Sequence, residues 1–285
     1  MTMDLAAQAV EEGGGGRPFH RFLMCPPTYF SVRYSINPWM RPDQPVNVAI
    51  AVRQWQQLVE TVEALGHRVL LMEPEPGLPD MVFTANGGIA IGDRAMAPRF
   101  LHDERAAESI HFAQALGQLG FREVRQPRFV NEGEGDFRYV AGRILAAHGF
   151  RSEVRAADEV EAFFGIPVTK LRLVDPRFYH LDTALAVLDD ATVAYWPGAF
   201  AKRSRAVLDA LFPDAILATE QEAEAFCINM ISDGRNVITA AGCAELSRRL
   251  TERGFTVHPV EIGELRKAGG GAKCCVLQLH AASTS

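Results

Sequence analysis

A repeated unit constrains the fold of this chain more than any other feature. Three copies are clear, over residues 87–126, 183–220 and 229–262, and each reads as strand, short turn, strand, helix and strand. In each copy, two short runs of alternating apolar and polar residues flank a turn (GDR, DDA or DGR), which is typical of a β-hairpin. The helical stretch that follows has apolar residues three and four positions apart. In the third copy these include Leu246 and Leu250, and that helix is expected to end at Gly254.

The position just before each first strand recurs every 47 residues, which predicts five ββαβ units. The unit at the C-terminal end lacks pieces that the N-terminal segment 20–73 supplies: a strand in HRFLMCPP, a long helix and the strand HRVLLME. Because the two ends complete one another, we predict an α/β fold closed into a five-bladed ββαβ propeller with pseudo-fivefold symmetry. An open solenoid would instead need capping repeats. The recurring positions are Asn86, Gly133, His180, Cys227 and Cys274. Around one small central cavity we expect Asn86, the Glu132/Glu134 segment, His180 and Cys274.

The composition indicates a globular protein and excludes several functional classes. Of 285 residues, 48% are hydrophobic and 22% charged, and the formal net charge is −6. With no basic run, nucleic acid is not an expected partner. With no apolar run of about 18 residues, no membrane span is expected. The N-terminus is acidic and glycine-rich where a signal peptide would be basic and then apolar, so we expect a flexible leader over 1–17, a single domain over 18–285 and a cytoplasmic location.

The cysteines and histidines do not form a recognisable metal or disulfide pattern. The number of cysteines is odd and no CxxC, HxxxH or HExxH spacing occurs, which argues against a disulfide framework, a structural zinc site or a catalytic metal. Most of the cysteines are expected to be small buried apolar side chains. They are Cys25, Cys227, Cys243, Cys274 and Cys275.

Cys274 is the candidate nucleophile. It follows the glycine-rich run KAGGGAKC, which allows close approach of the backbone, and it precedes the apolar strand VLQL. The neighbouring Lys273 and nearby backbone amides are expected to lower the thiol pKa. If the segment is a strand, Cys275 points to the opposite face. A buried core cysteine is the alternative interpretation.

Acidic residues and one histidine form the other half of the candidate site. His180 and Asp182 would share one face of an extended strand, and so would Glu132, Glu134 and Asp136 in NEGEGDF. A cysteine, a histidine and a carboxylate are the usual parts of nucleophilic catalysis. The surplus of acids indicates a cationic ligand, and a guanidinium is the planar donor that pairs with several carboxylates.

Five motifs in order resemble the guanidino-group-modifying superfamily, which contains arginine deiminases, dimethylarginine dimethylaminohydrolases, amidinotransferases and arginine dihydrolases. The resemblance extends from residue 21 to about 279 and implies the five-bladed pentein fold. It is nearest to the arginine dihydrolase-like branch, because Asn86 stands where deiminases and dimethylaminohydrolases usually have Asp. An Asn can bind both a cationic guanidinium and a neutral ureido group. The motifs are MCPPTYFSVRYSINPWM, DMVFTANGG, EGEGDF, FYHLDT and GGGAKC.

The resemblance implies roles for individual residues. Cys274 matches the nucleophile and His180 the general acid/base. The triad acid is Glu132 or Glu134, since EGEGD is one residue longer than the deiminase pattern EGGD; Glu132 is preferred because it opens the motif. The remaining residues are expected to bind substrate: Asp182 holds the guanidinium, Phe83 stacks on its plane, Arg105 contacts the amino-acid part, and Asn37, Asn86 and Asp136 complete the set.

The function implied is a hydrolase that acts on the guanidino group of arginine or a close derivative, without metal or cofactor. Arginine dihydrolase activity, giving ornithine, CO2 and ammonia, is the leading hypothesis. A dimethylarginine dimethylaminohydrolase that makes citrulline and an amidinotransferase are the alternatives on the same fold, and a non-catalytic binding propeller is the alternative of a different class. A small guanidino compound is the expected partner, and formation of a homo-oligomer is left open.

Overall fold

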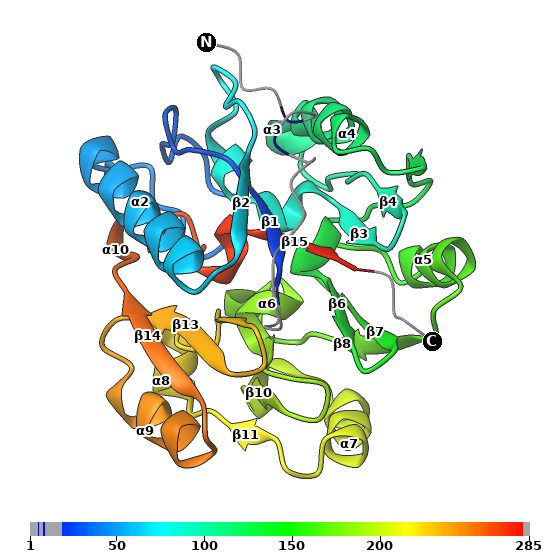
Figure 1. Ribbon diagram of the computed structural model, residues 1–285, viewed down its shortest axis with the longest axis vertical. Coiled ribbons are helices and arrows are strands. Elements are labelled where there is room, and N and C mark those ends of the chain that lie inside the picture. The colour runs from blue at the N-terminus through cyan, green and yellow to red at the C-terminus, as the bar shows by residue number, and fades with distance from the viewer. Residues whose placement is uncertain (1–4, 6–7, 9–18, 282–285) are drawn as a thin grey trace.

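The computed structural model describes Leu5, Gln8 and residues 19–281, and this part of the chain forms an α/β fold of four sheets (Figure 1). One sheet has six strands in the order β2-β1-β15-β3-β4-β5, and three sheets have three strands each, β6-β7-β8, β9-β10-β11 and β12-β13-β14. The strands are β1 Arg21–Met24, β2 Arg68–Leu71, β3 Ile89–Ile91, β4 Arg94–Met96, β5 Glu123–Arg125, β6 Phe137–Val140, β7 Arg143–His148, β8 Val168–Arg172, β9 Leu185–Val187, β10 Val193–Tyr195, β11 Ile216–Leu217, β12 Ile231–Ser232, β13 Asn236–Ala240, β14 Thr256–Val260 and β15 Leu277–His280.

The same connectivity occurs five times: two antiparallel strands, a helix, and a third strand parallel to the second. The predicted completion of the last unit by the N-terminal segment is confirmed, since β15 pairs antiparallel with β1 and β1 pairs parallel with β2. Figure 1 shows the unit helices on the outside and β1, β15 and α6 near the centre. The unit helices are α2 Val48–Ala64, α4 Glu108–Gln118, α5 Ala156–Phe164, α7 Lys202–Leu211 and α9 Ala244–Glu252.

Short helical turns, rather than strands, open four of the units, and this corrects three expectations. The segments around Cys274, around His180 and Asp182, and in NEGEGDF were expected to be extended. Successive side chains are rotated by about 100° in an α-helical turn and about 120° in a 3₁₀ turn, so residues two apart point in different directions. The turns are η2 Thr84–Gly87, η3 Gly133–Gly135, α6 Leu181–Ala184 and η6 Lys273–Cys275; the other short helices are η1 Pro79–Val82, α3 Asp103–Ala106, η4 Pro176–Phe178, η5 Pro197–Ala199, α8 Glu220–Glu224 and α10 Gly263–Arg266.

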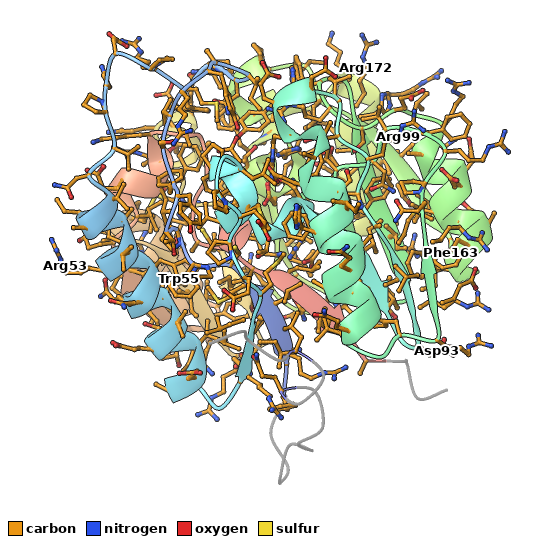
Figure 2. The ribbon with its side chains drawn as sticks, turned by 90° about the horizontal axis from the view of Figure 1, so that it is seen from above. Arg53, Trp55, Asp93, Arg99, Phe163 and Arg172 are labelled. Atoms are coloured by element: carbon orange, nitrogen blue, oxygen red, sulfur yellow. A yellow bond between two sulfur atoms is a disulfide. The ribbon has the colours of Figure 1, made fainter. Side chains whose placement is uncertain are left out.

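The unit helices pack one face on the sheets. The Asn47 side chain caps α2 by accepting a hydrogen bond from the Ile50 N–H, and Trp55 points inward while Arg53 points to solvent (Figure 2). In α9, Leu246 and Leu250, four residues apart, are both buried.

The helix expected in the first copy of the repeat is instead two, α3 and α4, separated at Ala107. Arg105 in α3 and Glu108 at the start of α4 form a buried ion pair of 2.7 Å.

The predicted leader over 1–17 lies outside the described residues except at two positions. Leu5 is buried in the cluster that contains Leu70 and Leu23, and the Gln8 side chain accepts a 2.9 Å hydrogen bond from the Leu71 N–H. Among the helices of the described residues, none combines the length and apolar character that crossing a membrane requires.

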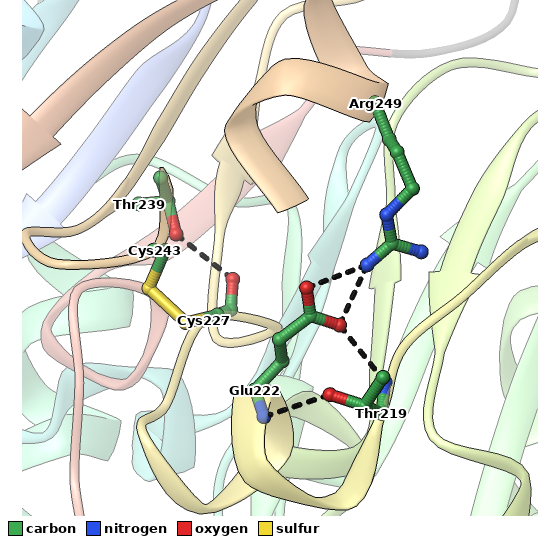
Figure 3. Close-up of a disulfide and its surroundings, with 6 residues drawn as sticks. All are labelled: Thr219, Glu222, Cys227, Thr239, Cys243 and Arg249. Atoms are coloured by element: carbon green, nitrogen blue, oxygen red, sulfur yellow. Dashed lines mark hydrogen bonds and ion pairs between the residues drawn. A yellow bond between two sulfur atoms is a disulfide. The ribbon is translucent and has the colours of Figure 1, made fainter. Parts of the chain in front are cut away.

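A disulfide joins Cys227 to Cys243, which corrects the expectation that the cysteines form no such bond (Figure 3). It connects the turn after α8 to the residue that precedes α9. The Thr239 hydroxyl donates to the Cys227 carbonyl, and Glu222 pairs with Arg249 beside it. Sequence spacing could not indicate this pair, because the two residues meet only when α8 and α9 pack at one end of their sheets. Cys25, Cys274 and Cys275 are free and buried, as expected.

The disulfide should stabilise the fold by restricting the unfolded chain. For a separation of 16 residues, replacing both Cys227 and Cys243 with Ala should lower the free energy of unfolding by about 3 kcal/mol. Urea unfolding followed by circular dichroism measures this. A reductant should lower the unfolding midpoint of the unaltered protein and leave that of the double variant unchanged; equal midpoints for all samples would contradict the prediction.

Candidate active site

Residues from separate units meet at a small cavity of about 10 Å³, room for about one water molecule. Six of the predicted site residues line it: Asn37, Phe83, Asn86, Arg105, His180 and Cys274. Residues that sequence reasoning missed, including Asp80, Arg151 and Tyr179, line it as well.

The Cys274 thiol lies between an acceptor and a donor. Its S–H donates to Asp182 Oδ2 at 3.2 Å, and Asn229 Nδ2 donates to Sγ at 3.1 Å. Burial raises the pKa of Cys274 well above its ordinary value, and the Asp182 carboxylate raises it further. The expected lowering by Lys273 is wrong, because the Lys273 ammonium points to Glu134 at 2.8 Å. The thiol is therefore protonated in this state.

The three glycines before Cys274 let three site residues approach the backbone. A Cβ on Gly269 would lie 2.8 Å from Asn37 Oδ1, and one on Gly271 would lie 2.6 Å from Asn229 Oδ1. A Cβ on Gly270 would overlap the Phe83 ring. Each glycine of this run therefore has a side chain packed against its backbone, as the sequence predicted.

His180 contacts Glu132. The distance from His180 Nε2 to Glu132 Oε2 is 2.8 Å, and Arg151 Nη1 donates to the same oxygen at 2.9 Å. Burial alone would raise the pKa of Glu132, but Arg151 and His180 together hold it well below its ordinary value. Glu132 is therefore an anion that can orient the His180 ring and stabilise its protonated form.

Glu134, the alternative triad acid, lies elsewhere, which corrects its place in the predicted catalytic set. Its carboxylate accepts hydrogen bonds from Lys273 Nζ at 2.8 Å, Arg138 Nη1 at 2.9 Å and the Gln278 N–H at 2.8 Å. Despite complete burial, Lys273 and Arg138 hold the pKa of Glu134 well below its ordinary value. The 3₁₀ turn separates the two glutamates, so that only Glu132 contacts His180.

Asp136, which is expected to bind substrate, uses both carboxylate oxygens in contacts within the protein. Asp136 Oδ2 accepts from the Ser152 hydroxyl at 2.7 Å and Oδ1 accepts from the Leu181 N–H at 3.2 Å, and the residue is not among those lining the cavity. Burial raises its pKa to about 6. Asp136 therefore holds the start of α6 in place.

Two other buried carboxylates each have an oxygen without a hydrogen-bond partner, Asp182 Oδ1 and Asp80 Oδ1. Asp80 lines the cavity, and its other oxygen accepts from the Tyr34 hydroxyl at 2.8 Å. Asp182 contacts the thiol that lines the cavity. Unpaired buried carboxylate oxygens are costly, so the site is suited to a cation that donates several hydrogen bonds.

Asn86 and Arg105 are joined by a hydrogen bond. Arg105 Nη1 donates to Asn86 Oδ1 at 2.8 Å, and Asn86 Nδ2 donates to the Glu132 carbonyl at 3.0 Å and lies 3.5 Å from His180 Nε2. These contacts fix the Asn86 amide with its N–H side toward His180.

Of the residues missed, Asp80, Tyr179 and Asn229 had a usable signal in the sequence. Asp80 opens the motif DMVFTANGG and Tyr179 lies in FYHLDT, while Asn229 follows Asp182 by 47 residues, the interval of the repeat, and so occupies the equivalent place in the next unit. Arg151 lies in none of the motifs, and only the folded chain brings it to the cavity.

The Glu134 contacts predict a large loss of stability when its charge is removed. Glu134→Gln leaves Lys273 and Arg138 buried without their carboxylate, which should cost about 3–5 kcal/mol of unfolding free energy at pH 7. Because the folded-state pKa is depressed, this stabilisation is present above the unfolded pKa of about 4.3 and is lost as the pH falls further. The difference between the two proteins should therefore shrink in acid.

Urea unfolding at several pH values measures both effects. Adding Lys273→Met to the Glu134→Gln variant should recover part of the lost stability. The control Glu245→Gln removes a carboxylate from an exposed ion pair with Arg248 and should leave the stability nearly unchanged. Equal effects of Glu134→Gln and Glu245→Gln would contradict the interpretation.

Comparisons with known proteins show the family to which this chain belongs. The model of the family "N,N dimethylarginine dimethylhydrolase, eukaryotic" matches residues 27–281. The chain is 49% identical, over 260 residues, to an N(G),N(G)-dimethylarginine dimethylaminohydrolase of Mycobacterium tuberculosis, covering 91% of this chain and 86% of the relative. It is 37% identical, over 265 residues, to the bifunctional arginine dihydrolase/ornithine cyclodeaminase ArgZ of Synechocystis, covering 91% of this chain and 37% of ArgZ.

The solved structure of the N-terminal domain of ArgZ bound to product, from a cyanobacterial arginine dihydrolase, superposes with a TM-score of 0.89 at 34% identity. The match covers 92% of this chain and 98% of that domain. The chain belongs to the dimethylarginine dimethylhydrolase family, within the guanidino-group-modifying superfamily that its sequence motifs indicate.

Proposed function

We propose that this protein is a cysteine-dependent hydrolase of C–N bonds in the guanidino group of arginine, with arginine dihydrolase activity that yields ornithine, CO2 and ammonia. The observation that carries the proposal is the Cys274 thiol held beside Asp182 at a cavity where two buried carboxylate oxygens have no partner. A guanidinium supplies both the positive charge and the N–H donors that these oxygens lack.

The proposed first step begins when the guanidinium pairs with Asp182 and displaces the thiol from it. The substrate cation then lowers the thiol pKa, and the proton passes to His180. Cys274 Sγ attacks the guanidino carbon, and a C–N bond breaks as His180 protonates the departing nitrogen, which leaves as ammonia.

In the second step, water attacks the resulting thiouronium carbon with His180 as the base. The C–S bond breaks, leaving a ureido product. Glu132, itself held by Arg151, stabilises protonated His180 in both steps. A second round on the ureido group would complete the dihydrolase reaction.

Asn86 favours the dihydrolase over its alternatives. Its amide N–H side lies 3.5 Å from His180, close to where the nitrogen must depart, and an amide tolerates both a charged guanidinium and a neutral ureido group. The similarity to the Mycobacterium tuberculosis protein supports dimethylarginine dimethylaminohydrolase activity as the second candidate. An amidinotransferase would use the same intermediate with an amine in place of water.

We also propose that the five units close into a five-bladed propeller with pseudo-fivefold symmetry, and that residues 18–285 fold as a single domain. The identical connectivity of the units and the pairing of β15 with β1 support this, because closure leaves no unit without two neighbours.

Cys274→Ser should reduce turnover of arginine by roughly 10³-fold or more while leaving the fold intact. The protein is incubated with arginine, citrulline and methylarginines, and ammonia, ureido product, methylamines and ornithine are measured. Ornithine from arginine supports the dihydrolase, and citrulline from methylarginines alone supports the second candidate. Cys275→Ala, which removes the adjacent buried thiol, should retain turnover. Loss of turnover only in that variant would mean that Cys275, and not Cys274, is the nucleophile.

Asn86→Asp should separate the two rounds of hydrolysis. The new carboxylate can still accept from Arg105 and can pair with cationic arginine, although it faces the Glu132 carbonyl and should slow the first round somewhat. The second round, on a neutral ureido group, loses an N–H donor, a cost of about 1–3 kcal/mol or a factor of about 5–150. Citrulline should therefore accumulate. Undiminished ornithine formation would contradict the role of Asn86.

A further inference from the structure

Asn229 is completely buried and all of its hydrogen-bonding groups are used. Nδ2 donates to Cys274 Sγ at 3.1 Å and to the Asp182 carbonyl at 2.9 Å, and Oδ1 accepts from the Cys274 N–H at 3.2 Å. The amide therefore binds the thiol, the backbone of the nucleophile and the backbone of Asp182 at once.

Sγ lies in surroundings that otherwise oppose a negative charge. Asp182 Oδ2 is 3.2 Å away, and burial of the sulfur together with this carboxylate raises the pKa of Cys274. His180 lines the same cavity. The nearest ammonium in sequence, Lys273, donates to Glu134 and to the Val276 carbonyl. The Gly271 N–H and the Asn229 amide are the donors that favour the thiolate.

We propose that Asn229 is a catalytic residue, whose amide N–H stabilises the Cys274 thiolate and aims it at the guanidino carbon. Asp182 and Asn229 occupy equivalent places in successive units, 47 residues apart, and both contact the Cys274 sulfur. The carboxylate accepts the S–H while the site is at rest, and the amide remains on the sulfur once substrate has taken the carboxylate. Hydrogen bonds to charged groups are stronger than those to neutral ones, so the contact favours the ionised thiol.

This inference rests on the proposed function, but its first test needs no turnover. The rate of alkylation of Cys274 by iodoacetamide is measured from pH 6 to 11, with the modified cysteine located by tandem mass spectrometry because Cys275 is adjacent. Asn229→Leu, similar in shape but without hydrogen-bonding groups, should raise the apparent pKa of Cys274 by about one unit or more, a tenfold or greater loss of rate at neutral pH.

Asn236→Leu is the matched control, because Asn236 belongs to the same unit and its amide bonds to Asp233 rather than to the thiol. It should leave the alkylation profile unchanged. Asn229→Asp keeps the size and an acceptor for the Cys274 N–H but places a second carboxylate at the sulfur. It should raise the apparent pKa further, and it decides the question if the Leu variant does not fold, as judged by thermal melting.

If the wild type turns over arginine, kcat of both Asn229 variants should fall tenfold or more at neutral pH, recover as the pH rises, and leave KM within about twofold, because the amide has no free group for substrate. A folded Asn229 variant whose alkylation profile matches the wild type overturns the inference. A shifted profile in a protein that hydrolyses no guanidine supports the inference and overturns the proposed function instead.

Discussion

The arrangement of the site depends on the hydrogen bonds and ion pairs that the buried Glu134 carboxylate makes. It accepts from Lys273, one residue before the nucleophile, and from the Gln278 N–H in β15, while its own turn carries Glu132. Glu132, Glu134, Arg138, Arg151 and Lys273 are all buried, and each is stable only because a partner of opposite sign meets it. Glu134 thus joins the segment that bears the thiol to the segment that bears the partner of His180, and it contacts neither reacting group.

Neighbouring backbone and side-chain groups hold the Cys274 thiol in place, and no activating cation contacts it in the described part of the chain. The glycine run brings the backbone against Asn37, Phe83 and Asn229, and the thiol then lies between a carboxylate and an amide. In this state burial and the Asp182 carboxylate keep the sulfur protonated.

The fold could be predicted where it follows from the regular spacing of the repeat, but not where it depends on the local conformation of a few residues. The interval of 47 residues and the complementary chain ends predicted the repeating connectivity and the pairing of β15 with β1. Alternation, by contrast, placed Glu132, Glu134 and Asp136 on one face. Gly133 has φ +64, and the resulting 3₁₀ turn sends the three carboxylates to His180, to Lys273 and to Ser152. The disulfide was missed for a related reason, since its two cysteines meet only through the packing of α8 and α9.

The α/β class, the repeat, the family and the place of Cys274, His180 and Asn86 at the cavity could be predicted from the sequence, because periodicity and motif spacing are properties of the chain. The folded molecule was needed to show which glutamate contacts His180, that Asp136 supports α6, and that Arg151 lies at the cavity. Those assignments depend on side-chain directions and on charges brought together from different units. Each is fixed by the need to satisfy buried polar groups after the units have packed, and no local pattern in the sequence encodes that requirement.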